Sequence, residues 1–218
     1  MRTVMTLNPK GGCGKSTLAT NLASFFASAG NSVALADLDS QRSSLEWLEA
    51  RAEEYPEYPT VTGVDGCNGA LRVPRSCDML VLDAPAAVHG SDLTALVKRA
   101  ETIIIPVLPS PMDMRACARF ITELLTVGKV SRQQTKLAVV ANRVRENTVI
   151  YQSLEAFLRR LSIPFIATLR DSQNYIRAAE RGLGIFELAP SLAANDLEHW
   201  KPLLRWVKSK RSQPEGSD

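Results

Sequence analysis

Short apolar segments rich in Val, Ile and Leu recur along the chain and alternate with amphipathic stretches. Strands of a parallel sheet are buried on both faces and read as continuous apolar runs, whereas the helices that cover the sheet are apolar on one side only. The alternation therefore predicts an α/β fold, with a mostly parallel twisted sheet flanked by helices. The predicted strands are Val4–Leu7, Val33–Ala36, Met79–Leu82, Ile103–Val107, Leu137–Ala141 and Phe165–Ala167.

The first helix is predicted between the first two strands, where apolar residues recur at helical spacing before a glycine. Asp92 and Asp113 suit the N-caps of two later helices, because a side-chain oxygen can accept a hydrogen bond from a free backbone N–H group. The segment Tyr55–Ser76 has three prolines, three glycines and weak periodicity, and it receives no assignment. Further helices are expected at Ser44–Glu54, Asp92–Arg99, Asp113–Val127, Val149–Leu161 and Asn174–Arg181.

The composition suits one globular domain, because 45% of the 218 residues are hydrophobic and 22% are charged. We expect residues 1–211 to form it and residues 212–218, which are polar with Pro and Gly, to be a disordered tail. The four cysteines lack the paired spacings of metal or redox sites, which predicts reduced thiols. The chain has no signal-peptide pattern and no apolar run of ~18 residues, so a cytoplasmic protein is expected.

A glycine-rich segment, Asn8–Thr17, connects the first strand directly to the first helix. Glycines let the backbone wrap its N–H groups around phosphate oxygens, and the positive end of the helix dipole points at the same anion. Gly11, Gly12, Cys13 and Gly14 would form this cradle. Lys15 can reach the β- and γ-phosphates, Ser16 can coordinate Mg²⁺, and Thr17 can support the α-phosphate. The alternative is a glycine-rich turn without a ligand.

The same segment departs from the ordinary phosphate loop, with Pro9 at a glycine position and an additional Lys10. In this form it resembles the deviant loop of the ParA/MinD family of P-loop ATPases. The resemblance implies an ATP-sandwich homodimer in which Lys10 reaches the nucleotide of the partner subunit. In the alternative interpretation Lys10 is a solvated loop charge.

The second predicted strand is followed by Asp37 and Asp39, which should lie on the same side at the carboxyl end of the sheet. The stretch resembles the family's switch I. The resemblance implies that Asp39 orients the attacking water and that Asp37 helps to hold the magnesium shell. A helix cap or turn is the alternative role for either carboxylate.

Three further positions extend the resemblance, which spans about Met1 to Glu187. The run Met79–Leu82 ends in Asp83 and resembles a Walker B strand that delivers its carboxylate near Mg²⁺, with Asp83–Ala86 as switch II. Asn142 follows another strand, and the family places its adenine-recognising asparagine there. Asp113 has two open interpretations, a contact with the dimer partner or a helix cap.

The resemblance implies slow, partner-stimulated ATP hydrolysis, with Lys10, Lys15, backbone amides and Mg²⁺ stabilising charge while Asp39 aligns water. It also implies a nucleoid-associated protein that partitions or positions DNA or another large cargo through an adaptor of ParB type. No helix-turn-helix segment precedes the phosphate loop, and in this respect the chain resembles the small partition ATPases. Metal-cluster carriers and bacterial tyrosine kinases of related fold fit less well, because paired cysteines and a tyrosine-rich tail are absent.

Basic residues are dense in the second half of the chain, although the net charge is only +3. We expect some of them to bind DNA phosphates without sequence preference, although solvated helix faces explain any one of them equally well. A MinD-like membrane-positioning ATPase is the alternative, because apolar residues from Leu197 to Val207 are interleaved with the basic ones. Pro202 and the polar ending favour packing of this apolar stripe onto the core instead. The expected DNA contacts are Arg170, Lys201, Arg205, Lys208, Lys210 and Arg211.

Overall fold

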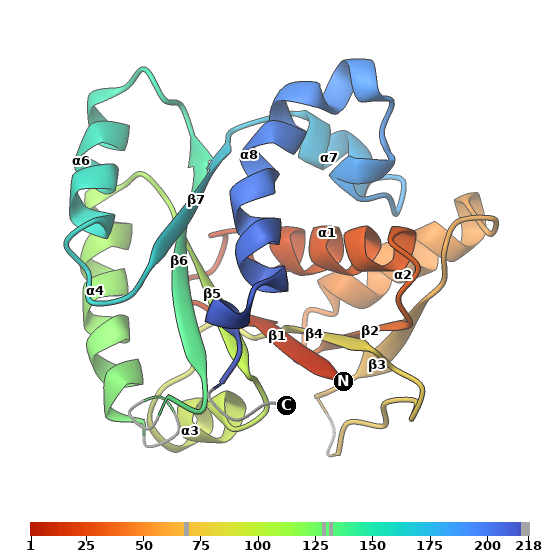
Figure 1. The fold of residues 1–218 in the computed structure, drawn as a ribbon, viewed down its shortest axis with the longest axis horizontal. Helices are drawn as coiled ribbons and strands as arrows, with labels where there is room; N and C mark the ends of the chain where they lie inside the picture. The colour runs from red at the N-terminus through yellow and green to blue at the C-terminus, as the bar shows by residue number, and fades with distance from the viewer. Residues whose placement is uncertain (68–69, 128–129, 131–132, 215–218) are drawn as a thin grey trace.

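A seven-stranded parallel sheet forms the centre of the computed structural model, which describes residues 1–67, 70–127, 130 and 133–214 (Figure 1). The strand order is β3-β2-β4-β1-β5-β6-β7, so β1 and β4 lie near the middle and β3 lies at one edge. The predicted α/β class with a parallel sheet is confirmed. The strands are β1 (Arg2–Thr6), β2 (Val33–Asp37), β3 (Val61–Asp65), β4 (Met79–Asp83), β5 (Thr102–Val107), β6 (Lys136–Val144) and β7 (Phe165–Arg170).

Helices cover both faces of the sheet. One layer contains α1, α2, α7 and α8, and the other contains α3, α4 and α6 (Figure 1). Short 3-10 turns η1 (Ile185–Glu187) and η2 (Lys210–Ser212) precede and follow α8. The helices are α1 (Lys15–Ser28), α2 (Ser43–Glu54), α3 (Gly90–Val97), α4 (Pro111–Thr126), α6 (Val149–Leu158), α7 (Asn174–Ala179) and α8 (Pro190–Lys208).

Each central strand contributes side chains to both hydrophobic layers. Val4 packs with the α1 and α8 side, whereas the next residue, Met5, packs with the α3, α4 and α6 side. Ile103 and Ile104 divide in the same way. This follows from the period of two along a strand, and it explains why the buried strands read as unbroken apolar runs.

The structure corrects two predicted helix caps. The N-cap of α3 is His89, and Asp92 lies in the first turn of that helix. The N-cap of α4 is Ser110, whose hydroxyl accepts a hydrogen bond from the backbone N–H of Asp113. Serine and aspartate are about equally favourable N-caps, so the residue types alone did not distinguish Ser110 from Asp113.

The end of the described chain differs from the expectation of a tail that starts at residue 212. Ser212 is fully buried, and its carbonyl accepts a hydrogen bond of 2.6 Å from the Thr102 hydroxyl. Its hydroxyl also accepts one from the Arg2 guanidinium at 3.0 Å. Ser212 therefore belongs to the folded domain, and residues 215–218 of the predicted tail lie outside the described residues.

The apolar stripe near the carboxyl end packs against the sheet, as Pro202 and the polar ending had suggested. It lies on α8, which continues through Pro202 as one helix. Trp200, Leu203, Leu204 and Val207 are buried in the same cluster as α1. Within the described residues, no helix combines the length and apolar character needed to span a bilayer.

Candidate nucleotide-binding site

The phosphate loop runs from the end of β1 to the start of α1, at the carboxyl edge of the sheet. Gly12 and Gly14 have φ values of 74° and 97°, a region that side chains other than glycine rarely adopt. A Cβ atom on Gly14 would also lie 2.2 Å from the side-chain nitrogen of Asn142. The loop conformation therefore depends on glycine for both backbone and steric reasons.

Two asparagines hold the loop in place. The Asn8 side-chain amide donates to the Pro106 carbonyl at 2.7 Å, and its oxygen accepts from the Lys10 backbone N–H at 2.9 Å. Asn142, which is buried at the loop, donates from its side-chain nitrogen to the Cys13 carbonyl at 2.8 Å. Asn142 was expected to contact adenine, and in this structure its amide N–H group serves the loop. These bonds fix the cradle without a ligand.

The two lysines of the loop have different environments. Lys15 is 7% exposed, and its ammonium donates to the Lys10 carbonyl at 3.2 Å, so it stays folded over the loop. The Lys10 ammonium lies 3.5 Å from a carboxylate oxygen of Asp113, a nearly buried residue on α4 of the same chain. Within a single chain, Asp113 therefore pairs with the lysine that was expected to reach across a dimer.

Asp83, at the end of β4, is an almost completely buried carboxylate. One of its oxygens accepts a hydrogen bond of 2.7 Å from the Ser44 hydroxyl, whereas the other has no hydrogen-bond partner among the described residues. Burial raises the pKa of Asp83 to about 6, and hydrogen bonds from the hydroxyls of Ser16 and Ser44 oppose that rise.

The surroundings of Asp83 fit a divalent cation. Mg²⁺ prefers oxygen ligands and usually takes one or two of them from protein carboxylates. The unpartnered oxygen of Asp83 and the hydroxyl of Ser16 supply such ligands beside the phosphate loop. A buried charge without a full set of partners is unfavourable, so a cation would also relieve a cost that the protein alone leaves in place.

Asp37 and Asp39 lie beside this carboxylate but have other contacts. Asp37 is fully buried and pairs in register with Asp83 across β2 and β4. One of its oxygens accepts from the Ser44 backbone N–H at 2.8 Å, so it satisfies a free N–H group in the first turn of α2, whose N-cap residue is Arg42. Asp39 is half-buried and accepts from the Gln41 N–H at 3.0 Å, which leaves its second oxygen free of the loop's own bonds.

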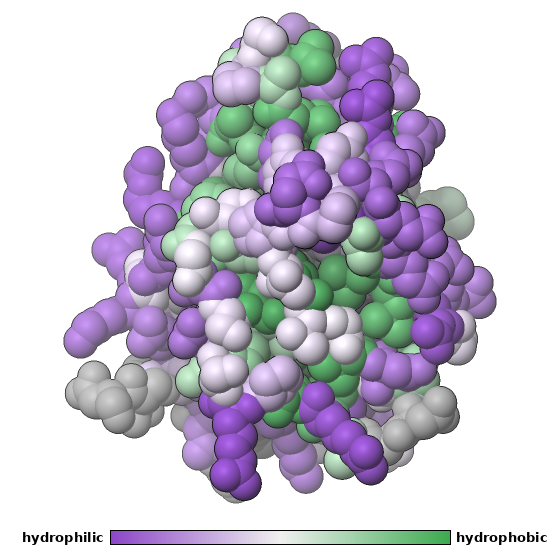
Figure 2. Space-filling model, turned by 90° about the vertical axis from the view of Figure 1, so that its right-hand side faces the viewer, coloured by the Kyte–Doolittle hydropathy of each residue, from purple (hydrophilic) through white to green (hydrophobic). Residues whose placement is uncertain are grey.

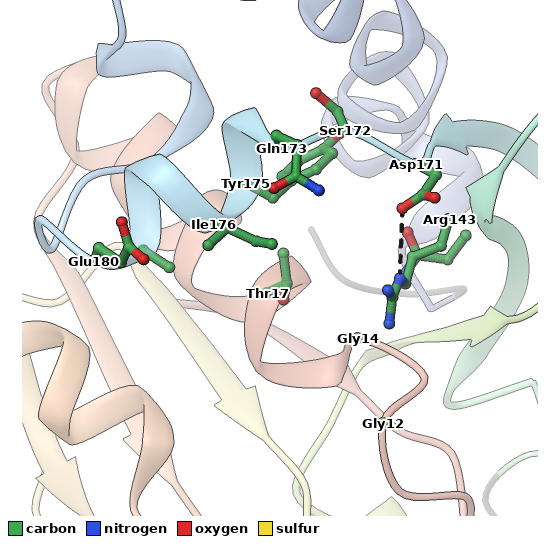
Figure 3. Close-up of a pocket in the computed structure, with 12 residues that line it drawn as sticks. Gly12, Gly14, Thr17, Arg143, Asp171, Ser172, Gln173, Tyr175, Ile176 and Glu180 are labelled. Carbon is green, nitrogen blue, oxygen red and sulfur yellow. Dashed lines mark ion pairs between the residues drawn. The ribbon is translucent and has the colours of Figure 1, made fainter.

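A cavity of about 350 Å³ opens next to the phosphate loop, between α1, the end of β6 and α7. Thr17 lies at its floor, and Tyr175 and Ile176 come from α7 on the opposite side (Figure 3). Arg143 and Asp171 form an ion pair at 3.7 Å on its rim. The cavity is large enough for a nucleoside and adjoins the phosphate cradle, so the two together suit a nucleotide.

Sequence reasoning missed several residues of this site. Ser44 looked like the start of a helix, and only the folded structure shows that its hydroxyl contacts Asp83. Tyr175 and Ile176 form the α7 wall of the cavity, although neither belongs to a recognisable motif. Asn8 begins the glycine-rich segment Asn8–Thr17. Its polar side chain directly after a predicted strand was the sequence feature that could have indicated its role.

The basic residues near the carboxyl end do not form a single patch. Arg170 is only half-buried, but it lies 3.3 Å from the buried carboxylate of Asp196 on α8. Lys208 is twelve positions further along that helix, about 18 Å away at ~1.5 Å per residue. Arg170 therefore pairs with a buried carboxylate while its own side chain stays partly exposed. Lys201, Arg205, Lys208, Lys210 and Arg211 are exposed, and Lys201 forms an ion pair with Glu198.

Comparison with known proteins extends over most of the chain. The carboxysome distribution protein "Maintenance of carboxysome distribution protein A" of Halothiobacillus neapolitanus is 29% identical over 191 residues, which cover 85% of this chain and 87% of that protein. The chromosome-partitioning ATPase Soj of Thermus thermophilus is 28% identical over 190 residues, covering 73% of this chain and 76% of Soj.

Two solved structures share the fold. A variant of McdA from Cyanothece in complex with ATP has a TM-score of 0.68 at 17% identity, covering 93% of this chain and 96% of that one. Cobyrinic acid a,c-diamide synthase from Mycobacterium smegmatis, with a bound ATP analogue and magnesium, has a TM-score of 0.69 at 18% identity and covers 100% of both chains. Residues 4–185 match the profile described as the CobQ/CobB/MinD/ParA nucleotide binding domain. The chain therefore belongs to the CobQ/CobB/MinD/ParA family of nucleotide-binding domains, as its resemblance to ParA and MinD predicted.

Proposed function

We propose that this chain is an ATPase of the ParA type that uses ATP binding and hydrolysis to position a large cargo. The observation that supports it most strongly is the pairing of a preformed phosphate loop with Asp83, whose free carboxylate oxygen lies in the same buried site. The fold of nucleotide-bound neighbours and the names of the two relatives agree with this proposal.

The chemistry proposed for the chain's own residues consists of positioning and charge stabilisation. Backbone N–H groups of residues 11–17 hold the phosphates, and Lys15 neutralises charge on the β- and γ-phosphates. Ser16 and Asp83 would hold Mg²⁺, with Asp37 behind them, bonded to the first turn of α2. When bound, Mg²⁺ supplies positive charge that stabilises the leaving phosphate oxygens. Asp39, which keeps one oxygen free, aligns the attacking water.

Dimerisation completes the proposed site. Lys10 pairs with Asp113 at 3.5 Å within the chain, and its side chain is 39% exposed, so it can exchange this partner for the phosphate of a second subunit. The exchange would leave the nearly buried Asp113 carboxylate without its partner, a cost that the contact of Lys10 with the nucleotide phosphate would offset. ATP would therefore favour a homodimer, and loss of the γ-phosphate would release it.

The cargo and its track follow from the relatives and from the surface charges. The relatives are named for carboxysome distribution and for chromosome partitioning, so we propose an adaptor of ParB type or its equivalent for this chain. We propose that the chain binds DNA of the nucleoid, in the cytoplasm, without sequence preference, and that the cargo is positioned along this DNA. The exposed basic residues of α8 and η2 would bind its phosphates. The membrane alternative has less support, because Trp200, Leu203, Leu204 and Val207 of the apolar stripe are buried.

The central proposal is tested by two substitutions that remove different steps. Lys15→Ala should abolish binding of Mg·ATP, measured by isothermal titration calorimetry, because the phosphate charge loses its buried partner. Asp39→Ala should bind Mg·ATP and dimerise in analytical ultracentrifugation, but it should not hydrolyse ATP. Equal loss of binding in both variants would refute the separate roles, and no binding by the unaltered protein would refute the function.

The DNA proposal is tested by charge reversal at the end of the chain. Replacement of Lys208, Lys210 and Arg211 by Glu should weaken retardation of arbitrary duplex DNA by the ATP-bound protein and reduce its dependence on salt. Arg72, Arg75 and Arg99 are also exposed, so their replacement by Glu gives the same change in net charge elsewhere. Equal weakening by both sets would show a net-charge effect and not a binding surface.

A further inference from the structure

The sheet ends in a strand whose outer side is open. Within the described part of the chain, β3 pairs only with β2, in parallel, and no other strand lies beyond it. Thr62, Gly63 and Asp65 are exposed, whereas Val61 and Val64 are buried under the helices. An edge strand of this kind presents unpaired backbone N–H and C=O groups that can accept another extended chain.

A groove follows this edge on the side of α2. One part is a cavity of about 380 Å³. It is lined by Leu45, Leu48, Ala52 and Gly63, by Glu49, and by Arg42 and Asp65, which form an ion pair with each other at 2.9 Å. It continues into a second cavity of about 220 Å³ that shares Leu48 and Ala52 and reaches Val61. Gly63 keeps the floor open, because a Cβ atom there would lie 3.0 Å from a methyl carbon of Leu48. Figure 2 shows the side of the molecule where α2 and β3 lie, with apolar residues among hydrophilic ones.

An acidic stripe runs beside the groove. Glu46, Glu49 and Glu53 are exposed on α2 and recur at helical spacing, next to the stripe of Leu45, Leu48 and Ala52 that lines the groove. None of the three glutamates forms an ion pair with another described residue. The stripe is therefore a negative surface on a protein whose net charge is +3, which makes it a local feature.

We propose that this edge binds an extended, basic segment of a partner protein, which adds to the sheet as a strand beside β3. Backbone hydrogen bonds along the edge would supply binding that does not depend on sequence, and alternate side chains would enter the groove. These groove-facing side chains would be lysine or arginine, whose aliphatic stems would pack along the groove while their charged ends meet Glu46, Glu49 and Glu53.

The charges argue against two other occupants. Two copies of the chain paired through β3 would place one acidic stripe against the other, which is repulsive. DNA phosphates would meet the same negative surface. A basic peptide is the occupant whose charge complements the stripe while its backbone complements the strand. Binding of such a peptide would not require nucleotide, and it is a function separate from the ATPase activity proposed above.

The test uses a short fluorescein-labelled peptide of alternating Val and Lys, with alternating Val and Glu as the control peptide. Fluorescence anisotropy at low salt should show binding of the Lys peptide only. The double variant Glu49→Lys, Glu53→Lys should weaken this binding by about tenfold, because two attractions become repulsions. The matched double variant Glu54→Lys, Asp92→Lys has the same net charge with both changes at exposed sites outside the groove, and it should bind like the unaltered protein.

Nuclear magnetic resonance locates the peptide. Backbone amides of residues 61–65 should shift and exchange more slowly with solvent when the peptide binds, because some of them gain hydrogen bonds. Absence of binding, shifts confined to another surface, or equal weakening by the two double variants would each overturn the proposal. In those cases the acidic stripe only protects the edge from pairing. All variants should bind Mg·ATP equally, so this outcome is separate from failure of the ATPase proposal.

Discussion

Replacement of Asp83 by Asn should make the nucleotide-free protein more stable at neutral pH while it removes the cation site. Asp83 is 1% exposed, and one of its oxygens has no hydrogen-bond partner among the described residues. Burial raises its pKa from the ordinary value of 3.8 to about 6. The charged carboxylate is therefore less favourable in the folded state than in the unfolded chain, whereas Asn has a similar shape and no charge.

The sign and size of the effect follow from proton linkage. Below about pH 4 the carboxyl group is protonated in both states, so burial of the charge costs nothing. As the pH rises toward 6, the unfolded chain loses this proton first, and the free energy of unfolding falls. Above pH 6 the full penalty of about two pKa units applies, or about 3 kcal/mol at ~1.4 kcal/mol per unit. Asp83→Asn should regain most of that, about 2–3 kcal/mol.

Thermal or urea unfolding at several pH values measures this difference. A domain of this size gains about 2–4 °C in Tm for each kcal/mol, so the variant should melt several degrees higher at pH 7.5 and show little gain at pH 4. The control Asp92→Asn changes an exposed carboxylate and should stay within about 0.5 kcal/mol. With Mg·ATP the order should reverse, since only the unaltered protein keeps its cation ligand. A variant that is less stable at every pH would refute the reasoning.

Two further substitutions probe the surroundings of the loop. Gly14→Ala should lower nucleotide affinity and reduce stability by more than about 1–2 kcal/mol, because φ is 97° and the methyl group would meet Asn142. Urea unfolding measures the loss of stability, and calorimetry measures the loss of affinity. The additional change Asn142→Ala should restore only the stability lost through the steric clash, and not that lost through the positive φ. Ser44→Ala should reduce stability by about 1.5–3 kcal/mol at pH 8, where Asp83 is charged and loses its 2.7 Å donor, and by less at pH 5. Ser44→Thr, which keeps the hydroxyl, should restore it, and a loss that does not depend on pH would show that Ser44 acts through packing alone.

The fold was predictable where burial is complete. The strands β1, β2, β4, β5 and β6 carry apolar residues toward both helix layers, so each contains an apolar run in the sequence. The edge strand β7 is only partly buried, and its predicted run covered only its first three residues, Phe165–Ala167. The edge strand β3 has the pattern buried, exposed, exposed, buried, exposed and contains Thr62, Gly63 and Asp65. It has neither a continuous apolar run nor strict alternation, and for that reason it was not assigned.

The candidate site divides in a similar way. The phosphate loop could be predicted because its chemistry is local, with glycines, lysine and hydroxyl residues within one turn of the chain. Contacts between distant segments could not. Ser44 and Asp83 are 39 positions apart, and Asn142 and Cys13 are 129 apart, yet each pair is hydrogen-bonded. Their side chains are compatible with many roles, and only the order of strands in the sheet brings them together.

The sheet order also connects the two buried carboxylates of the site to helix α2. Asp37 and Asp83 end neighbouring strands in register, and Ser44 donates to both, through its backbone N–H to Asp37 and through its hydroxyl to Asp83. The first turn of α2 is thus fixed to the same carboxylate that we propose holds the cation. Any ligand that draws Asp83 toward the phosphate loop must move Ser44 or break a hydrogen bond to a buried charge, which costs about 1.5–3 kcal/mol. If Asp83 holds the cation as proposed, this one hydroxyl couples nucleotide binding to the position of α2.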